Sequence, residues 1–449
     1  MYKVILIIRY LFKKQISYLA SLAVALCVFI VTVVMTVMTG LLSEFKQKNH
    51  NFVGDCIVGT ESLVGFPGYE DFVKILEQCD FVEGVSPVIK SYALVSLDGT
   101  ERSRGIEIMG IDPVKHSKVT SFGKTLYYNR DKASKAFEPA YDPALAGCVV
   151  GVDLWLVRNA WGEYSYAPVP AKAALAITCF PLTAKGALAK AGTDMVNTKI
   201  FYYSDTSRSG LARVDGSIIY LPFGDAQMLC GMAGTDKRTN AIYIKFKPGV
   251  KLAAGCEKVA LLWKNFAAEK TADKSVDLLK TVTVKSWKDY RRTFVAAMEK
   301  EYTMVAVMFA LVGITTVCIV FVVLYMIVSH KSKDIGILKS VGASKADVVE
   351  LFCGFAVTVG LLGSCVGIIG GWLFLLRINK IENWLFEHFG FQLWDRTIYA
   401  IGSIPNEVEP KLLVVITLAA VAVCLAGAFV PSRYAAKLEP VQSLQVSQL

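Results

Sequence analysis

A chain of 449 residues in which 54% are hydrophobic, with positive mean hydropathy, belongs to the membrane class rather than among soluble multidomain proteins. The formal net charge of +10 would suit a nucleic-acid binder, but such proteins concentrate Lys and Arg on one soluble face. Here much of the positive charge adjoins apolar segments. It therefore indicates membrane topology, and we expect no nucleic-acid partner.

The N-terminal segment predicts an elbow that leads into the membrane. Apolar residues recur at helical spacing from Val4 to Phe12, and the basic residues fall largely off that stripe. The apolar stretch that follows is too long for a signal peptide and has no small-residue cleavage site. We expect an interfacial helix over residues 1–15 and a transmembrane helix over residues 16–42.

Three further stretches contain no charged residue and are long enough to cross a hydrocarbon core of about 30 Å, which takes about 20 helical residues. They cover residues 302–329, 351–376 and 412–432. The fold class expected from them is an α-helical membrane protein with four transmembrane helices. A large segment, residues 43–301, separates the first helix from the second.

Charge in the short loops predicts the orientation. The N-terminal segment, the loop 330–350 and the tail 433–449 are rich in Lys and Arg, which marks the cytoplasmic side. The loop 377–411 mixes both signs. Both termini are therefore expected in the cytoplasm, and the segments 43–301 and 377–411 outside it.

The segment 43–301 has the pattern of a mixed α/β domain. A β-rich pattern resumes after a poorly patterned stretch, so residues 55–111 and 241–287 are expected to form one lobe and the middle of the segment another. Residues 117–143 are expected as a long loop. The predicted helices cover residues 69–79 and 253–264, and the predicted strands cover residues 85–97, 105–111, 199–203, 217–221 and 241–246.

Neither catalytic nor metal-binding chemistry stands out. No GxxxxGK[ST] motif is present, and Gly54 to Thr60 has the glycine spacing but lacks the Lys that cradles phosphates. The four His residues are scattered, no CxxC occurs, and no predicted span holds an ionisable residue, which argues against an ion-coupled carrier. We expect no cofactor or metal in this chain and no enzyme activity of its own. Six Cys residues fall in the segment 43–301 and allow 15 disulfide connectivities, so pairing and free thiols both stay open.

The cytoplasmic loop 330–350 is more structured than a linker. An apolar stripe indicates a short helix, Gly342 stands where that helix would end, and Ser344 begins a capping-box pattern. What remains is a device that moves mechanical change between a cytoplasmic partner and the large outer segment, and this loop is the candidate for docking that partner. The expected coupling residues are Lys333, Asp334, Ile335, Gly336, Leu338, Lys339, Val341, Gly342 and Ser344.

Two further sets of residues are candidates for function in the membrane. Small residues let helix backbones approach closely, so a glycine face in the third span predicts tight packing against another span or a second copy of the chain. Flexible apolar side chains near the outer ends of the first two spans suit a groove for an acyl chain, although simple helix packing explains them equally well. The packing set is Gly360, Gly363, Gly367 and Gly370, and the groove set is Met35, Met38, Leu42, Met304, Val305 and Met308.

The stretch His330 to Phe352, HKSKDIGILKSVGASKADVVELF, resembles the coupling segment of MacB/FtsX-type ABC permeases. The tail Pro431 to Pro440 is similar to that family's terminal PxRxAxxxxP element. Within the family the chain is most similar to the LolC/LolE lipoprotein-releasing permeases, and the likeness covers nearly the whole chain. It is carried by Ile8 to Leu11, Val37 to Gly40, Gly84 to Pro87, Gly110 to Pro113, Asp215, Ile219 to Leu221, Gln227 and Ile404-Pro405.

The resemblance implies a two-lobed MacB-type periplasmic domain over residues 43–301 and a location in the cell inner membrane. It also implies partners: two copies of an ABC ATPase that bind ATP and Mg²⁺, a second permease chain that is identical or homologous, a lipoprotein substrate, membrane lipid and a periplasmic lipoprotein carrier. Two alternatives stay open, of which the first shares these mechanics and the second is a non-transporting protein of another class. One is a MacB-like exporter of peptides or drugs through an adaptor and an outer-membrane duct, and the other is an FtsX-like regulator of periplasmic hydrolases.

Overall fold

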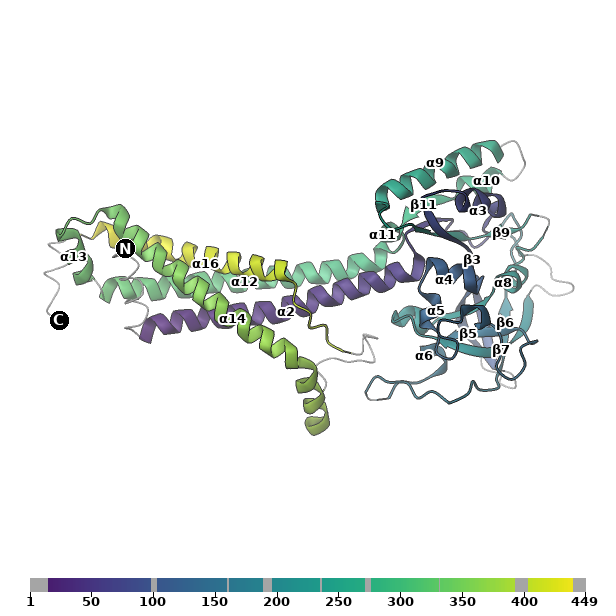
Figure 1. The fold of residues 1–449 in the computed structure, drawn as a ribbon, viewed down its shortest axis with the longest axis horizontal. Helices are drawn as coiled ribbons and strands as arrows, with labels where there is room; N and C mark the ends of the chain where they lie inside the picture. Colours follow the sequence, from purple (N-terminus) through teal and green to yellow (C-terminus); the bar gives the residue numbers. More distant parts are fainter. Residues whose placement is uncertain are drawn as a thin grey trace. The chain divides into compact units, whose positions relative to one another are not determined.

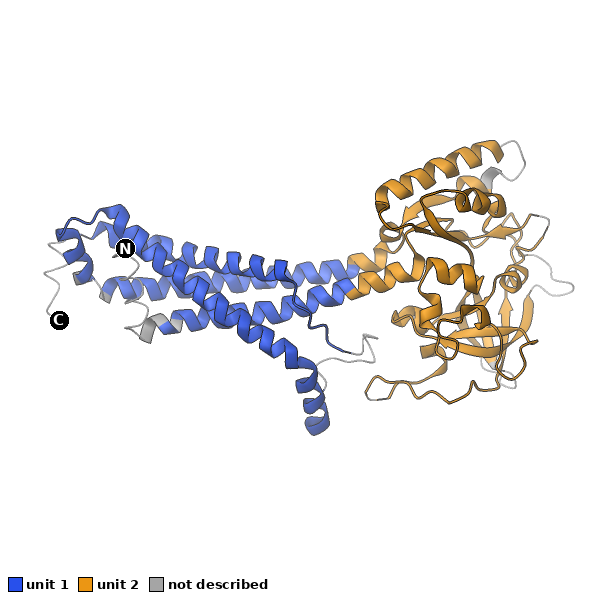
Figure 2. Cartoon of the chain, viewed as in Figure 1, with its two compact units in different colours: residues 1–43, 297–394, 403–449 blue, residues 44–296, 395–402 orange. Residues whose placement is uncertain are grey.

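The computed structural model describes residues 15–97, 103–159, 161–188, 196–234, 236–270, 276–330, 332–391 and 403–438. The chain divides into two compact units (Figure 2). Unit 1 consists of residues 1–43, 297–394 and 403–449, and unit 2 of residues 44–296 and 395–402. The elbow helix predicted for residues 1–15 lies outside the described residues, apart from its last position.

Unit 1 is helical. Four helices, α2 (Gln15–Val53), α12 (Arg292–His330), α14 (Lys345–Phe389) and α16 (Pro410–Lys437), each contain a stretch long and apolar enough to cross a membrane (Figure 1). The short helix α13 (Ser332–Ser340) lies between α12 and α14 in the chain. All four long helices extend beyond the predicted spans, because hydropathy marks the apolar part of a helix and not the point where its backbone stops.

The third long helix corrects one prediction. Residues 377–389, expected as the start of a loop, continue α14 for three more turns until Gly390, which takes the left-handed conformation with φ 63° and ends the helix. Ile378 and Glu382 in this extension are buried at 8% and 1% exposure. Gly390 therefore ends this helix well beyond the residues that hydropathy marks.

Unit 1 is held together by aliphatic side chains from all four long helices. Val24 of α2, Leu324 of α12, Phe352 of α14 and Cys424 of α16 belong to one buried cluster. On the segment before α16, the backbone of Ile404 exchanges two hydrogen bonds with the amide of Asn379, of 2.8 and 3.1 Å. These bonds satisfy polar groups that would otherwise be unpaired beside an apolar core.

Unit 2 is built on a nine-stranded sheet (Figure 1). The strands follow the spatial order β11-β1-β10-β3-β4-β8-β5-β7-β6, and β6 pairs again with β3. Their bounds are β1 (Cys56–Gly59), β3 (Val82–Leu97), β4 (Ser103–Ile111), β5 (Gly147–Gly151), β6 (Ala174–Cys179), β7 (Asn197–Ser207), β8 (Ile218–Pro222), β10 (Ala241–Phe246) and β11 (Thr283–Ser286). A separate pair joins β2 (Phe66–Pro67) to β9 (Arg238–Thr239).

The long strand β3 takes part in two halves of this sheet. Residues 82–88 pair with β10 in an open, antiparallel half, while residues 88–96 pair with β4. On its other edge, residues 93–97 pair with β6, which closes β3, β4, β8, β5, β7 and β6 into a ring. Closure removes the free edges that an open six-stranded sheet would expose.

Each half has its own core. Helices α3 (Tyr69–Glu77) and α9 (Leu252–Lys270) contribute Phe72 and Trp263 to the cluster over the open half, and the side chains of Ile108, Ile177 and Tyr203 belong to the cluster of the ring. The remaining short helices are α4 (Pro113–Val119), α5 (Phe122–Thr125), η1 (Ala133–Lys135), α6 (Val152–Trp155), α7 (Ala212–Asp215), α8 (Phe223–Leu229), α10 (Val276–Lys280) and α11 (Trp287–Tyr290).

The predicted elements of unit 2 are confirmed where the pattern is long. Both predicted helices appear as α3 and α9, and all five predicted strands appear as β3, β4, β7, β8 and β10. The strands β1, β5, β6 and β11 are additional. The ends of the segment form the open half, as expected, but residues 89–111 pass into the ring and so shift the predicted lobe boundary.

Candidate functional sites

The segment between α12 and α14 has the geometry that its sequence predicts. Helix α13 ends in a Schellman motif, in which the amide of Ala343 donates to the carbonyl of Leu338 and that of Gly342 donates to Lys339, both at 3.1 Å. Gly342 has φ 106°, a conformation that side chains strain. Ser344 and Asp347 then form a reciprocal capping box at the start of α14. The helix, the tight break and the next helix are therefore confirmed.

The apolar residues of α13 point in different directions. Ile335 is 1% exposed and belongs to the core of unit 1, so it does not share an outward face with Leu338 and Val341 as the sequence pattern suggested. Leu338 is half-buried, while Val341 and Ile337 are 83% and 52% exposed. Ile337 and Val341 are four residues apart and form an exposed apolar pair, which we call the α13 pair. Ile337 was missed because periodicity alone does not say which side of a short helix is covered.

Lys339 has a partner within its own chain. Its ammonium donates to the carbonyls of Ala436 and Leu438, both at 2.7 Å, at the C-terminal end of α16. The last carbonyls of a helix lack intrahelical partners, and a cation there satisfies them and favours the helix dipole. This contact ties α13 to α16. Of the other predicted residues, Gly336 is buried and Asp334 half-buried, and the side chain of Lys333 lies outside the description.

The glycine face of α14 lies against two other helices of unit 1. A Cβ on Gly360 would come within 3.2 Å of Val421 on α16, and one on Gly363 within 2.7 Å of Val24 on α2. At Gly367 it would meet the carbonyl of Ala25 at 2.5 Å, whereas at Gly370 it would find Phe29 at an ordinary 3.5 Å. Three of these four positions therefore need a small residue for packing within the chain.

The residues predicted for an acyl groove have unequal surroundings. On α2, Met35 is 8% exposed, and Met38 and Leu42 are half-buried. On α12, Met304 and Met308 are 56% and 65% exposed, and Val305 is half-buried. The α12 methionines thus form an outward apolar surface, and the α2 residues belong mostly to the packed interior. Their role as a groove stays a prediction.

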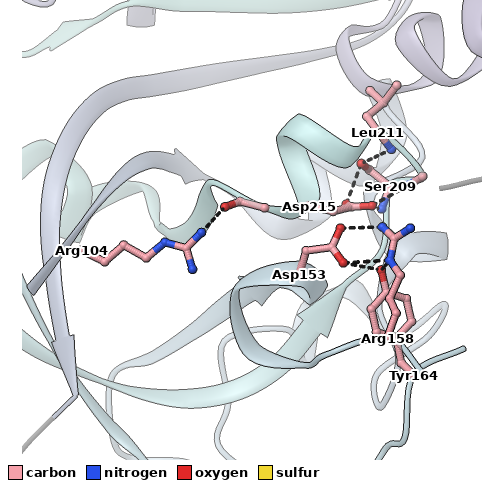
Figure 3. A network of polar contacts seen from close by, with 9 residues as sticks. Arg104, Asp153, Arg158, Tyr164, Ser209, Leu211 and Asp215 are labelled. Atoms are coloured by element: carbon pink, nitrogen blue, oxygen red, sulfur yellow. Dashed lines mark hydrogen bonds and ion pairs between the residues drawn. The ribbon is translucent and has the colours of Figure 1, made fainter. Parts of the chain in front are cut away.

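A polar network in unit 2 surrounds the half-buried carboxylate of Asp153 and the buried carboxylate of Asp215 (Figure 3). Arg158 donates two hydrogen bonds to Asp153, of 2.6 and 3.0 Å, and the Tyr164 hydroxyl donates to the same carboxylate at 2.7 Å. Asp215 accepts hydrogen bonds of 2.7 to 2.9 Å from the backbone of Ser209 and Gly210 and from the Ser209 hydroxyl. Burial raises the pKa of Asp215, while these donors act to lower it.

These contacts fix loops and offer no nucleophile paired with a base. Asp215, one of the residues that carried the family resemblance, holds the turn before α7, and Gln227, another, donates to the carbonyl of Arg238 at 3.0 Å. Within the described parts of the chain, no three His, Cys, Asp or Glu side chains are grouped to hold a metal ion. The outer-segment resemblance thus rests on residues that stabilise the fold.

A family model matches the membrane part of the chain. Residues 306–440, from α12 to the tail, match the model of the FtsX-like permease C-terminal domain. This part is therefore similar to an FtsX-like permease domain. The match covers α13 and the glycine face of α14, the two features whose geometry is described above.

The whole chain has a curated relative of the predicted kind. It is 22% identical over 434 residues to the lipoprotein-releasing system transmembrane protein LolC of Neisseria meningitidis, covering 97% of this chain and 95% of that protein. It is also 28% identical over 117 residues to the macrolide export ATP-binding/permease protein MacB of Burkholderia thailandensis, covering 26% and 15% of the two chains. The relation to LolC/LolE-type permeases, expected from the sequence, is confirmed.

One solved structure shows a fainter likeness. The periplasmic region of MacB from Actinobacillus actinomycetemcomitans covers 55% of this chain and 95% of its own length, with a TM-score of 0.30 and 11% identity. That score is too low to support a fold assignment for unit 2.

Proposed function

We propose that this chain is the permease subunit of an ABC transporter that extracts lipoproteins from the outer leaflet of the inner membrane and releases them to a periplasmic carrier. The observation that carries the proposal is the near full-length relation to LolC, at 97% of this chain and 95% of the relative. The MacB relative matches 26% of the chain, so export through a duct has less support. In this proposal both termini are cytoplasmic and unit 2 is periplasmic.

Force enters through α13 in this mechanism. The permease carries no Walker motif, so ATP and Mg²⁺ bind to a separate ABC ATPase, of which two copies dock under two permease chains. The exposed α13 pair, Ile337 and Val341, supplies the apolar anchor for a cleft in the ATPase, and half-buried Leu338 supports it from the side. Closure of the ATPases pushes α13, and the Lys339 contacts pass that motion to α16.

Transfer of this motion depends on the tight turn between α13 and α14. Gly342 provides it, since a side chain at φ 106° costs about 1 kcal/mol or more. No atom lies within 4 Å of a Cβ built on Gly342, so the cost of a substitution is conformational and not steric. Gly342→Val should dock poorly or hydrolyse ATP without releasing substrate.

The test uses the permease with its ATPase in proteoliposomes loaded with a lipoprotein. Leu338→Glu and the double variant Ile337→Glu, Val341→Glu should insert normally but lose co-purification of the ATPase and ATP-driven release. Ala346→Glu is the matched control, because it adds the same charge at an exposed position in the first turn of α14, where acidic residues are favourable. If Leu338→Glu and the double variant both kept wild-type docking and release, α13 would not be the coupling element.

A further inference from the structure

A cleft of about 320 Å³ opens in unit 2 where the open half of the sheet meets the ring. Its walls come from β1, β3, β4 and β11, from α7 and α11, and from Phe52 of α2 and Phe294 of α12. Six charged side chains line it: the cations Lys90, Arg213, Lys285 and Arg291, and the carboxylates Glu61 and Glu107. Four cations against two carboxylates leave two positive charges in excess.

Two of the cations are accounted for by the two carboxylates. Lys285 is 2.9 Å from Glu61, and Arg213 is 3.8 Å from Glu107. Lys90 and Arg291 have no carboxylate within 4.0 Å among the residues that the structure describes. The two uncompensated charges of the cleft are therefore these two side chains.

Both uncompensated cations are held in place by neutral groups. Lys90 donates to the Tyr290 hydroxyl and lies 4.8 Å and 5.1 Å from the ring centres of Tyr290 and Tyr243. Arg291 donates from Nε to the Asn49 side chain at 2.8 Å, and among the described residues the terminal nitrogens of its guanidinium have no hydrogen-bond acceptor. Its guanidinium also lies 4.4 Å from the ring centre of Phe294 and 5.3 Å from that of Phe52.

A partly buried cation without a counter-charge is unfavourable, and aromatic rings replace only part of what a carboxylate would give. Burial lowers the pKa of Arg291, and the carboxylate of Glu107, which acts to raise it, offsets this only in part. Because the guanidinium is stacked and anchored at Nε, its free edge is preorganised to accept two oxygen atoms side by side. Such an arrangement suits a bound anion.

We propose that this cleft binds a phosphate group, with Arg291 as a fork on two phosphate oxygens and Lys90 as a point charge on a third. A phosphate carries up to about two negative charges and several oxygens, which matches two cations better than a single carboxylate does. Apolar side chains such as Phe52, Ile108 and Phe294 line the same cleft and suit the organic part of a phosphate ester. Phe52 lies on α2 and Phe294 on α12, the two helices through which the chain passes between its units.

The phosphate could come from a phospholipid headgroup or from a free phosphate compound, and the experiment separates the two. Binding of inorganic phosphate and of glycerophosphoglycerol, the water-soluble headgroup of phosphatidylglycerol, is measured by calorimetry on the full chain in detergent. Native mass spectrometry from nanodiscs then reports whether phosphatidylglycerol is retained over phosphatidylcholine. Preference for the headgroup and retention of the anionic lipid assign a lipid source, and preference for inorganic phosphate assigns a free one.

Lys90→Met and Arg291→Met should each weaken phosphate binding by about tenfold or more, as expected for loss of one charge-assisted contact. Lys285→Met, which removes a cation already paired with Glu61, should change binding by less than about twofold. Lys90→Arg and Arg291→Lys keep the charge and should retain part of the affinity, which separates lost binding from lost folding. Absence of any phosphate binding by the wild type, or unchanged affinity in both Met variants, would overturn the proposal.

Discussion

The two units differ in how far they bury their large apolar side chains. In unit 2 the largest buried side chains, among them Phe72, Phe201 and Tyr243, are enclosed by the sheet and its helices. In unit 1 the helices leave large apolar side chains outward, such as Met308 at 65%, Val366 at 61% and Leu418 at 65% exposure. A soluble protein does not carry such surfaces at this density, so unit 1 is shaped for lipid or for a second chain. Unit 2 is stabilised by its own interior.

The largest loss of stability in unit 2 is expected from a change at Asp205. Its carboxylate is fully buried and accepts hydrogen bonds of 2.7 to 3.1 Å from the backbone amides of Tyr127, Tyr128, Asn129 and Thr206. Asp205→Ala leaves several buried amides without a partner and should destabilise unit 2 by about 4 kcal/mol. Pulse proteolysis of the full chain in urea measures this loss. Asp142→Ala, which removes an exposed carboxylate with one amide partner, should cost less than about 1 kcal/mol. Equal costs for the two would mean that Asp205 is not a structural centre.

The cysteines of unit 2 provide a second test of how this unit is stabilised. In unit 2 the thiol of Cys56 interacts with that of Cys256, and the thiol of Cys179 with that of Cys230, and all four are free thiols in this structure. In a periplasmic unit 2 we expect both pairs to form disulfides, each losing two protons and two electrons to a disulfide-bearing oxidase of that compartment. Reduction should then cost unit 2 about 3 kcal/mol per bond.

Peptide mapping of the chain purified without reductant checks this pairing. It should find Cys56 linked to Cys256 and Cys179 linked to Cys230, with Cys79 and Cys148 free to react once the chain is unfolded. Six reactive thiols in unit 2 would contradict it.

A third test addresses the packing of unit 1. Gly367→Ala places a methyl group 2.5 Å from the carbonyl oxygen of Ala25 and 2.8 Å from Val28, so we expect a loss of about 2 kcal/mol from overpacking between α14 and α2. Gly370→Ala places the same group at 3.5 Å from Phe29 and should change little. Thermal melting in detergent compares the two. A larger loss at Gly370 than at Gly367 would show that α14 packs on a different face.

A fourth test addresses a pH dependence in unit 2. His116 is 1% exposed beside Lys90 and the Tyr243 ring, and burial lowers its pKa to about 3. At pH 7 both the folded and the unfolded chain keep this imidazole neutral. Below about pH 6.5 the unfolded chain binds a proton that the folded chain does not, so stability falls by up to about 1.4 kcal/mol per pH unit.

The measurement is the urea midpoint by pulse proteolysis between pH 7 and pH 4, in the wild type and in His116→Gln, whose amide can still contact Ser86. The variant should lose less stability toward acid than the wild type. If the urea midpoints of the wild type and the variant fell equally with decreasing pH, His116 would not be the source of the pH dependence.

The sequence best predicted those features that depend on residues close together in the chain. Four apolar stretches predicted four long helices, and the Ser344 capping box and the helix end at Gly342 needed residues only three to five positions apart. The α13 faces could not be read in this way, because Ile335 is covered by helices distant in sequence while Ile337 is not. The same holds for the extension of α14, in which Glu382 is buried although hydropathy marks it as polar.

Non-local pairing limited the prediction of unit 2. The ring closes through residues 93–97 of β3 and residues 175–179 of β6, and nothing in either strand specifies a partner about eighty positions away. Strand β5 is buried at all five positions, so it lacks the alternation that marks a half-buried strand. The cleft cations Lys90 and Arg291 likewise come from segments about two hundred residues apart. A single charged residue in a sequence does not indicate which distant charged residue will lie near it in the fold.

The shared strand β3 has a consequence for cooperativity. At about 3.3 Å per residue, its 16 residues extend for about 50 Å, and residues 93–96 pair with β4 on one edge and with β6 on the other. Both halves of unit 2 are built on this one continuous strand, so loss of β3 removes a pairing partner from each. The two halves should therefore unfold in a single transition, and the amides of residues 88–95 should be among the slowest in the chain to exchange with deuterium.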